Sequence, residues 1–517
     1  MANKKLFQSL KGMLMPATDA QNEECAPAYQ FTPEHQLAQY AVTGCLNSTF
    51  YASAEMQLKT VLALCTRVDA EFVALAAIYC RERGFMKDMP ALLVAALSSL
   101  DVKLFAEVFP RVIDNGKMLR NFVQVMRSGV VGRKSLGTAP RRCVREWLEA
   151  RSDEAVFKAA VGQSPSLADI VKMVHPKPKT ASRAALYAYL IGKAHEAGLL
   201  PELVRSFEAY KQGATAEVPN VPFEMLTALA LGTAEWAAIA RNASWQMTRM
   251  NLNTFARHGV FEQRGMTELI ARRLGNQEAI AKARAFPYQL LAAHASVSER
   301  VPRRVRLAIE TAMEMATANV PKIEGKVYVC PDVSGSMRSP VTGFRRGSTS
   351  AIRCVDVAAL VAASVLRRNP KAEVLPFECK VVDVRLNPRE SILKNAERLA
   401  KVGGGGTNCS APLALLNKRG ATGDLVIFVS DNESWVDAGR GRGTATMAEW
   451  QKFKARNPQA RLVCIDLQPY GTTQAKERED ILNIGGFSDQ VFEVISEFAA
   501  GRLNSSHWVG VIQSVNV

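Results

Sequence analysis

The 517-residue sequence lacks the features by which transmembrane, secreted and zinc-binding chains are recognised. No apolar run approaches the roughly 20 residues that a bilayer-spanning helix needs. The basic start MANKKLFQSLKGMLMPATDA has neither a sustained apolar core nor a small-residue cleavage site, so we expect a tail rather than a secretory leader, and a cytoplasmic protein. The ten cysteines include no C-x-x-C pair, which disfavours a zinc site and favours buried, reduced thiols.

Recognisable catalytic arrangements are also missing from the C-terminal part of the chain. After residue 320 the sequence has one histidine, His507, so no Ser-His-Asp or Cys-His set is present there. The glycine run at residues 403–406 lacks the lysine of a phosphate-binding loop. Because no general base is placed to activate water, we expect no enzymatic activity, and a metal-dependent nuclease or phosphohydrolase is the least favoured alternative.

The composition is typical of a globular protein with roughly two to four domains. Hydrophobic residues make up 48% and charged residues 22% of the chain, which excludes disordered and collagen-like proteins. The net charge of +16 favours an anionic partner. This charge is uneven, since residues 101–183 contain 16 basic and 8 acidic residues, a net charge of +8.

Residues 30–320 have the rhythm of short amphipathic helices. Apolar residues recur near i, i+3, i+4 and i+7. The segments are HQLAQYAVTGCL, AEMQLKTVLALCTRV, AEFVALAAIYCRERG, PALLVAALSSL, VKLFAEVFPRVI, ASRAALYAYLIGKAHEAG, PELVRSFEAYK, VPFEMLTALALGTAEWAAIA and MTELIARRLG. Stacked helix pairs, as in an α-solenoid, would bury such helices. Because no clear repeat period is visible, a general helical array remains the alternative.

The rhythm changes near residues 319–321. Strands are expected in GKVYVCPDVSGS, AEVLPFECK, VVDVRLN, DLVIFVSDNE, ARLVCIDLQP and VFEVIS, and helices in CVDVAALVAASVLRRN, SILKNAERLAKV and TMAEWQKFKARN. Strands that alternate with helices predict an α/β fold with a doubly wound, mostly parallel sheet. Ligands in this architecture bind beyond the carboxyl ends of the strands, where the polar loops of this sequence lie.

Three separate loops at expected strand ends carry hard oxygen ligands. The first strand ends in a D-x-S-x-S motif, a glycine-rich loop ends in threonine, and a later strand ends in Ser-Asp. Few carboxylates, several hydroxyls and room for water suit Mg²⁺, with Mn²⁺ as the second choice. The alternative is a turn in which these side chains cap the following helix. The predicted ligands are Asp332, Ser334, Ser336, Thr407 and Asp431.

The basic stretch is a candidate surface for nucleic acid. Its cations lie partly on the loops SGVVGRKSLGTAPRR and VHPKPKTASR, and they would contact phosphates in a salt-dependent and largely sequence-independent way. Aromatic residues are too few for a base-stacking channel. A solvated basic face is the alternative. The candidate RNA-binding residues are Lys117, Arg120, Arg127, Arg133, Lys134, Arg141, Arg142, Lys158, Lys172, His175, Lys177 and Lys179.

The C-terminal part resembles the von Willebrand factor A domain with its metal-ion-dependent adhesion site. By that resemblance Ser334, Ser336 and Thr407 would bind the ion directly, and the two aspartates through water. The chain as a whole resembles the Ro autoantigen family of TROVE-domain proteins, and a bacterial member of it, in SGVVGRKSLGTAPRR, VKMVHPKP, MTRMNLNTFARHGVF, AFPYQLLAA and VCPDVSGSM. The resemblance implies a flexible tail over 1–25, a ring of HEAT-like helical repeats over 26–320, an A domain over 321–517, and a monomer.

The resemblance also implies a function. The family binds small noncoding Y RNAs on an outer surface, in which His175 and Lys158 would lie, and it binds the 3′ single-stranded ends of misfolded or fragmentary RNA through the ring. A further basic position of the vertebrate pattern falls at Gly162 here. In bacteria the family is associated with the exoribonuclease polynucleotide phosphorylase, tethered through the RNA. These relations imply an RNA chaperone or adaptor in RNA quality control, decay or repair, with no membrane and no DNA partner; the alternative is a metal-dependent module that recognises an acidic motif in a protein partner.

Overall fold

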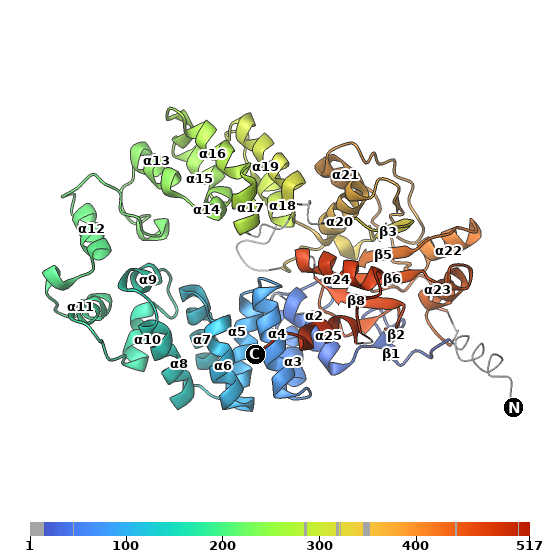
Figure 1. Ribbon diagram of the computed structural model, residues 1–517, viewed down its shortest axis with the longest axis horizontal. Helices are drawn as coiled ribbons and strands as arrows, with labels where there is room; N and C mark the ends of the chain where they lie inside the picture. Colours follow the sequence, from blue (N-terminus) through green and yellow to red (C-terminus); the bar gives the residue numbers. More distant parts are fainter. Residues whose placement is uncertain are drawn as a thin grey trace. The chain divides into compact units, whose positions relative to one another are not determined.

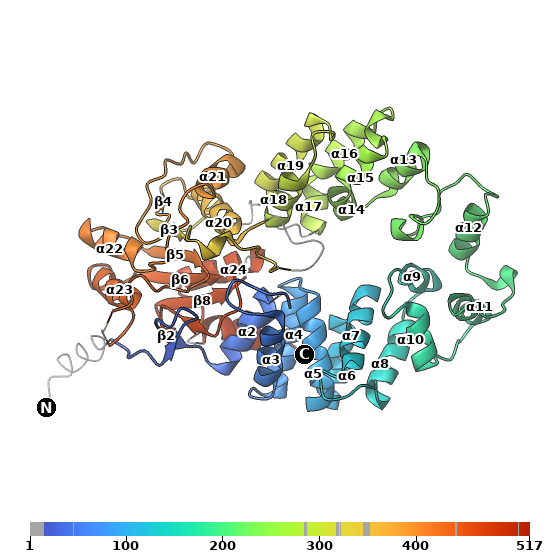
Figure 2. The same ribbon diagram turned by 180° about the vertical axis from the view of Figure 1, so that it is seen from behind.

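The computed structural model describes residues 15–44, 46–283, 287–316, 320, 322–344, 352–439, 442–486, 488–504 and 506–517. Within these ranges the chain forms two compact units (Figures 1 and 2). We call them the α/β unit, which contains residues 15–64, 287–295 and 313–515, and the helical unit, which contains residues 65–283, 296–312 and 516–517.

The helical unit is a succession of short helices, as the sequence predicts (Figure 1). None of the helices in the described part of the chain is long and apolar enough to cross a bilayer. Its α-helices, including those that continue into the α/β unit, are α3 (Ala54–Cys65), α4 (Ala70–Glu82), α5 (Asp88–Leu100), α6 (Val102–Val112), α7 (Gly116–Ser128), α8 (Thr138–Glu149), α9 (Asp153–Lys158), α10 (Leu167–Val174), α11 (Ala181–Leu190), α12 (Glu202–Lys211), α13 (Thr233–Asn242), α14 (Trp245–Met250), α15 (Leu252–Arg257), α16 (Met266–Leu274), α17 (Gln277–Ala283), α18 (Pro287–Ser296) and α19 (Arg303–Ala316).

Helix α7 illustrates how these helices pack and cap. Its apolar residues at positions 118, 119, 122, 123 and 126 are buried, which is the spacing of a single helix face. Phe122 of this face meets Phe105 and Phe109 of α6, with ring centroids 5.9 and 5.0 Å apart. The Asn115 side chain accepts a hydrogen bond from the Met118 amide at the start of the helix. The opposite, solvated face is therefore left for polar and basic side chains.

The α/β unit is built on a five-stranded sheet of order β4-β3-β5-β6-β8, in which every neighbouring pair is parallel. The strands are β3 (Val327–Pro331), β4 (Glu373–Val374), β5 (Leu425–Ser430), β6 (Arg461–Asp466) and β8 (Ile481–Gly485). The helices are α2 (Pro33–Thr43), α20 (Cys354–Arg368), α21 (Ile392–Leu399), α22 (Ala411–Lys418), α23 (Ala445–Arg456), α24 (Asp489–Ala499) and α25 (His507–Gln513), with the 3₁₀ turn η5 at Ser336–Arg338. The expected doubly wound, parallel architecture is confirmed.

One face of the sheet forms a continuous core with α22 and α23. Tyr328, Phe428 and Leu462 project from neighbouring strands into this core. They meet Trp450 and Phe453 of α23, whose rings stack 5.7 Å apart. Because successive side chains of a strand point to opposite faces, the intervening strand residues are available to the other face, where α20 packs against β3 and β5.

Two strand predictions in this unit are wrong. The segment VFEVIS at 491–496 lies inside α24, and the last strand is instead ILNIG, β8. In α24 the buried residues Val491, Phe492, Val494, Ile495 and Phe498 follow a helical spacing, which the β-branched composition of VFEVIS obscures. The segment VVDVRLN at 381–387 forms no strand; an isolated bridge pairs residues 377 and 381, and Val381 packs against the core.

The N-terminal segment belongs to the α/β unit. The expectation was a tail over 1–25 followed directly by the helical domain; residues 1–14 lie outside the described residues. Strand β1 (Ala20–Gln21) pairs with β2 (Pro27–Gln30), and β2 pairs with β7 (Thr472–Thr473). Tyr29 of β2 is fully buried in the core that contains Trp450. Burial of this aromatic side chain and the strand pairing fix a segment whose sequence is too short and irregular to predict a strand.

The nine described cysteines form no disulfide bond with one another, and seven of them are buried. Burial raises the pKa of several of these thiols, including that of Cys65 to about 12. Such thiols remain protonated and packed in apolar surroundings, as the sequence predicts for reduced structural cysteines.

A buried histidine in α2 makes the α/β unit sensitive to acid. The His35 ring stacks on Phe31 at 4.2 Å and meets Trp508 edge-on at 5.6 Å. Burial, reinforced by the nearby His507, lowers the pKa of His35 to about 3. A histidine that stays neutral in the folded state stabilises the fold above its unfolded pKa of about 6.5, and this contribution is lost as the pH falls. Between pH 7 and pH 5 we expect His35 to cost the unit about 2 kcal/mol of unfolding free energy.

The measurement is chemical denaturation of wild type and His35→Phe at both pH values. The variant should lose less stability on acidification by about that amount, whereas the exposed His195→Phe should behave as wild type. Equal losses in wild type and His35→Phe would contradict the assignment.

Candidate metal centre and basic surface

Neighbouring parallel strands bring the predicted metal ligands to one edge of the sheet. Asp332 directly follows β3 and Asp431 directly follows β5, and these strands are paired in register from Val327 and Leu425 onward. The Asp332 amide continues this pairing by donating to the carbonyl of Val429 at 2.9 Å. The two carboxylates are therefore neighbours at the carboxyl edge, as their positions in the sequence predict.

The glycine-rich loop is held directly against the D-x-S-x-S turn. The Gly404 amide donates to the Val333 carbonyl at 2.8 Å, and the Gly335 amide donates to the Gly405 carbonyl at 2.9 Å. Gly403 has a φ of +77°, and a Cβ atom there would lie 2.3 Å from the Val333 carbonyl oxygen. Glycine is thus required at this position, and the close approach brings Thr407 to the same edge as the aspartates.

The five predicted ligands are all buried, with exposed fractions from 0% to 6%. Asp332 accepts hydrogen bonds from the Ser334 amide at 2.8 Å and the Ser430 hydroxyl at 2.5 Å. The hydroxyls of Ser334 and Ser336 lie 3.4 Å apart, and that of Ser336 also hydrogen-bonds Asp431. Burial and the charge of Asp431 raise the pKa of Asp332 to about 7. Burial likewise raises the pKa of Asp431.

This donor set fits a small divalent cation. The Oδ1 atom of Asp431 is buried and has no hydrogen-bond partner among the described residues. Nor do three His, Cys, Asp or Glu side chains gather anywhere in the described ranges closely enough to hold an ion alone, so hydroxyl oxygens would have to complete any ligand set here. The helix-capping alternative finds no support, because η5 has no side-chain cap hydrogen bond. Two mutually repelling carboxylates, one orphaned oxygen and adjacent hydroxyls are the environment of a hard cation.

Two further acids at this edge were missed from the sequence. Glu433 is fully buried, and Asp466 at the end of β6 is 4% exposed. Burial and the charge of Asp431 raise the pKa of both well above the ordinary value. Asp466 accepts hydrogen bonds from Asn432 and from Gln39 of α2, each at 2.8 Å. Asp466 ends an apolar strand in the same way as Asp431, and this shared position was the available signal.

The predicted RNA-binding residues lie on α7 to α10 and on the loops between them, all within the helical unit. The charges of Arg127 on α7 and Lys172 on α10 both lower the pKa of Asp169, so these two helices present cations to one neighbourhood. His175 ends α10 in a left-handed conformation with φ of 48° and leaves its side chain exposed. The cations of the stretch thus come from several elements that contact one another.

The structure divides these residues by what their charged groups contact. Arg120 donates to the Ala159 carbonyl at 3.2 Å, and Arg133 donates to Ser98 and Ser99. Arg142 and Lys179 pair with Glu146 and Glu149. Among the described residues, no ion pair is found for the remaining exposed cations. These are Lys117, Arg127, Lys134, Arg141, Lys172 and Lys177; Lys158 is half-buried.

Arg120 takes up the space at Gly162, the position where the family pattern carries a cation. Gly162 has a φ of +103°, and a Cβ atom there would lie 2.6 Å from the guanidinium of Arg120. A side chain at this position would therefore be strained and would displace the arginine. The guanidinium of Arg120 from α7 therefore lies next to this position.

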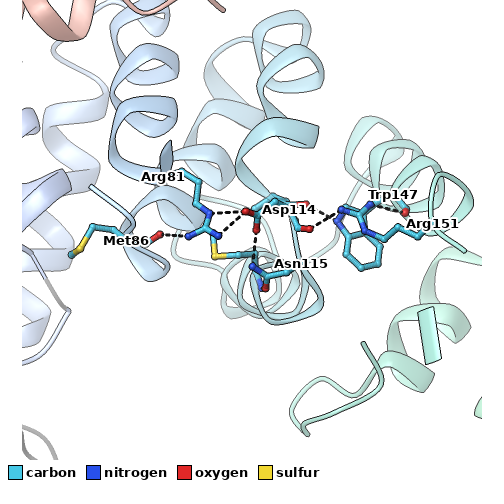
Figure 3. A network of polar contacts seen from close by, with 8 residues as sticks. Arg81, Met86, Asp114, Asn115, Trp147 and Arg151 are labelled. Atoms are coloured by element: carbon cyan, nitrogen blue, oxygen red, sulfur yellow. Dashed lines mark hydrogen bonds and ion pairs between the residues drawn. The ribbon is translucent and has the colours of Figure 1, made fainter. Parts of the chain in front are cut away.

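Other arginines of this part of the chain hold the helices together (Figure 3). Arg151 lies over the Trp147 ring at 3.6 Å and donates to the Asp114 carbonyl at 2.9 Å. Arg81 binds the Asp114 carboxylate through two nitrogens, at 2.6 and 3.1 Å, and the Met86 carbonyl. Their charges are engaged inside the unit, so only part of the basic excess is free to contact an anion.

Comparison with known proteins bears on both units. The family model described as the Ro60 vWA domain matches residues 326–499, and that of the TROVE domain matches residues 190–326. The RNA-binding protein RO60 of Deinococcus radiodurans is 24% identical over 556 aligned residues, which cover 97% of this chain and all of the relative. The chain thus carries a TROVE domain and a Ro60-type vWA domain. The resemblance drawn from its motifs is thus confirmed.

Further relatives differ in how much of the Ro-family chain they share. The RNA-binding protein RO60 of Caenorhabditis elegans is 22% identical over 275 residues, or 51% of this chain and 41% of the relative. The crystal structure of the Deinococcus radiodurans Ro (Rsr) protein matches with a TM-score of 0.63 and 21% identity, covering 91% of this chain and all of that one. This likeness shows a shared fold. The TROVE match begins at residue 190, so the basic stretch precedes it.

Proposed function

We propose that this Ro-family protein is a non-catalytic RNA-binding protein whose helical unit holds a small structured RNA, of the Y RNA kind, through its phosphates. The observation that carries the proposal is the set of exposed cations on α7, α8, α10 and their loops, for which no ion pair is found among the described residues. Cations spread over several elements suit the many phosphates of a folded RNA better than a small anion, which would need one compact site. The name RNA-binding protein, borne by both RO60 relatives, supports the proposal.

The aromatic residues near these cations favour recognition of shape over base stacking. Phe122, Trp147 and Phe157 are at most 4% exposed and belong to the core, as expected from the sequence. Their rings are closed to nucleobases, which a stacking platform would have to receive. Affinity would then depend on phosphate contacts and fall steeply with salt. We infer that 3′ single-stranded ends of damaged RNA, and an exoribonuclease tethered through the RNA, are the further partners of an adaptor in RNA quality control.

We also propose that the carboxyl edge of the α/β unit binds one divalent cation, Mg²⁺ in the first place. Ser334, Ser336 and Thr407 would supply hydroxyl ligands, and Asp332 and Asp431 would hold the ion through their carboxylates. The ion would supply the positive charge that these buried aspartates lack and would offer a coordination position to an acidic group. The chain's own residues orient the site through the Ser334 amide and the Ser430 hydroxyl, which fix Asp332.

The protein purified from its own host at low salt tests the RNA proposal. We expect an absorbance ratio that indicates bound nucleic acid, and sequencing of the extract should return a discrete, structured small RNA that high salt removes. Protein that carries no nucleic acid and also fails to bind a structured RNA with a 3′ tail would overturn the proposal. That outcome would favour the alternative, a metal-dependent module for an acidic protein partner.

A further inference from the structure

An acidic turn near the N-terminus lies over the carboxyl edge of the sheet. Asn22 is 6% exposed, and its side-chain nitrogen donates to the Ser434 carbonyl at 2.7 Å. Its side-chain oxygen accepts from the amides of Glu24 and Ala26, at 3.1 and 2.9 Å, and so closes the turn. The Glu23 amide donates to the carboxylate of Glu433 at 2.8 Å. The turn is therefore fixed to the loop that follows Asp431, and not merely adjacent to it.

Polar groups connect Glu24 with the candidate metal ligands. The hydroxyl of Tyr51 lies near the carboxylate of Glu24 and the hydroxyl of Ser336, and both groups influence its pKa. Ser336 is also near Asp431, whose pKa is raised by the charge of Glu24. The Tyr51 ring is held edge-on against Tyr470, with centroids 5.8 Å apart. The Glu24 carboxylate is thus presented to the site from outside the sheet by a half-buried tyrosine.

The turn adds the carboxylates of Glu23 and Glu24 to an edge of the sheet that already holds several buried acidic side chains. The charge of Glu24 raises the pKa of Asp431 and that of Glu23 raises the pKa of Glu433, so acidic groups from two distant segments of the sequence share one neighbourhood. Asp431 Oδ1 and Glu433 Oε1 are buried without a hydrogen-bond partner among the described residues. Like charges at such distances repel, and burial increases the cost. A divalent cation would neutralise these charges and would also bind the carboxylate oxygens that have no hydrogen-bond partner.

We propose that Glu24 is an intramolecular ligand of the metal centre, oriented by Tyr51, and that the turn at residues 22–26 closes the centre from the solvent side. The inference rests on the proposed cation site. Glu24 is exposed, so it is a ligand that can leave. An acidic group of another molecule would bind the ion by replacing the Glu24 carboxylate. Glu23 is the matched control, because it carries the same charge one residue away and meets the loop through its backbone.

The test is a titration of the metal-free, full-length protein with Mn²⁺, followed calorimetrically and by the electron paramagnetic resonance of free Mn²⁺. We expect wild type to bind one ion, Asp332→Asn to bind none, and Glu24→Gln to bind about 10- to 100-fold more weakly. Glu23→Gln should remain within about threefold of wild type. Acetate should restore part of the affinity of Glu24→Ala and have little effect on wild type, because only the variant has the position open.

The outcomes separate the two proposals. If wild type binds Mn²⁺ and Glu24→Gln binds it equally well, the metal centre stands and the Glu24 assignment fails. If wild type binds no ion at all, the metal centre fails and the assignment fails with it. Equal weakening by Glu23→Gln and Glu24→Gln would show a general charge effect and would also overturn the specific role of Glu24.

Discussion

Replacing Lys134, Arg141, Lys172 and Lys177 by glutamate should weaken RNA binding by on the order of 100-fold or more at about 0.1 M salt. Each phosphate contact contributes about 0.7 to 0.9 to the slope of log affinity against log salt, so the variant should lose about 3 units of slope. The four side chains are exposed on a loop, on α8, on α10 and on the following loop. None of the four makes an ion pair with another described residue, so their replacement should leave the fold of the helical unit intact.

A control with the same change of net charge isolates the surface from the overall field. Replacing the exposed Lys371, Lys394, Lys401 and Lys418 of the α/β unit by glutamate also lowers the net charge from +16 to +8, since each reversal removes two charges. Binding titrations at several salt concentrations should give this control a slope near that of wild type. If both variants lose the same affinity and slope, RNA is attracted by net charge alone and the proposed surface is wrong.

Replacing Asp332 by asparagine should abolish the stabilisation of the α/β unit by Mg²⁺ or Mn²⁺. Metal at about 100 times its dissociation constant should stabilise wild type by about 2.7 kcal/mol, which is roughly 5–10 °C in the melting temperature of a unit of this size. In the metal-free protein, by contrast, the carboxylate of Asp332 lowers the stability of the fold. Burial beside Asp431 raises the pKa of Asp332 to about 7, so the ionised group destabilises the fold as the pH rises through that value. Metal-free Asp332→Asn should therefore be as stable as metal-free wild type, or more so, at pH 8.

Calorimetric scans with and without metal check both parts of this expectation. The exposed Asp383→Asn is the control for loss of one carboxylate, and it should keep the full response to metal. A persistent metal-dependent shift in Asp332→Asn would place the ion elsewhere. Strong destabilisation of the metal-free variant would show that Asp332 serves as a hydrogen-bond acceptor for Ser334 and Ser430 and not as a ligand.

The gathering of the proposed metal ligands at one edge of the sheet could be predicted from sequence because it follows from topology. Once β3 and β5 are assigned as neighbouring parallel strands, Asp332 and Asp431 must meet at one edge, and the glycine run leaves a single place for Thr407. Contacts that depend on the fold of distant segments could not be predicted. No local pattern connects Glu24 or Tyr51 to Ser336, because their neighbourhood arises only when β2 pairs with β7.

For the basic stretch, the roles of individual residues could not be predicted from the sequence. The sequence identified which residues are cationic, but it could not separate the arginines that serve the fold from the lysines that face solvent. Arg133 binds backbone and hydroxyl oxygens of α5, and Arg151 covers Trp147, whereas Lys134 and Lys177 make no ion pair in the described part of the chain. A guanidinium group can donate hydrogen bonds to several carbonyls at once. An arginine between packed helices is therefore more often bound within the fold than a lysine.

The pairing of β2 with β7 has a consequence for synthesis of the protein. Strand β2 cannot pair with β7 until the chain is almost complete, since Gln30 donates to the Gly471 carbonyl, 441 residues later. Residues 65–283 and 296–312 of the helical unit are synthesised in the meantime. A fragment that begins at residue 321 would lack Tyr29 from its core and Glu24 from its edge. The C-terminal region should thus fail to form a soluble, metal-responsive unit when it is expressed alone. It should form one when the first 64 residues are expressed with it.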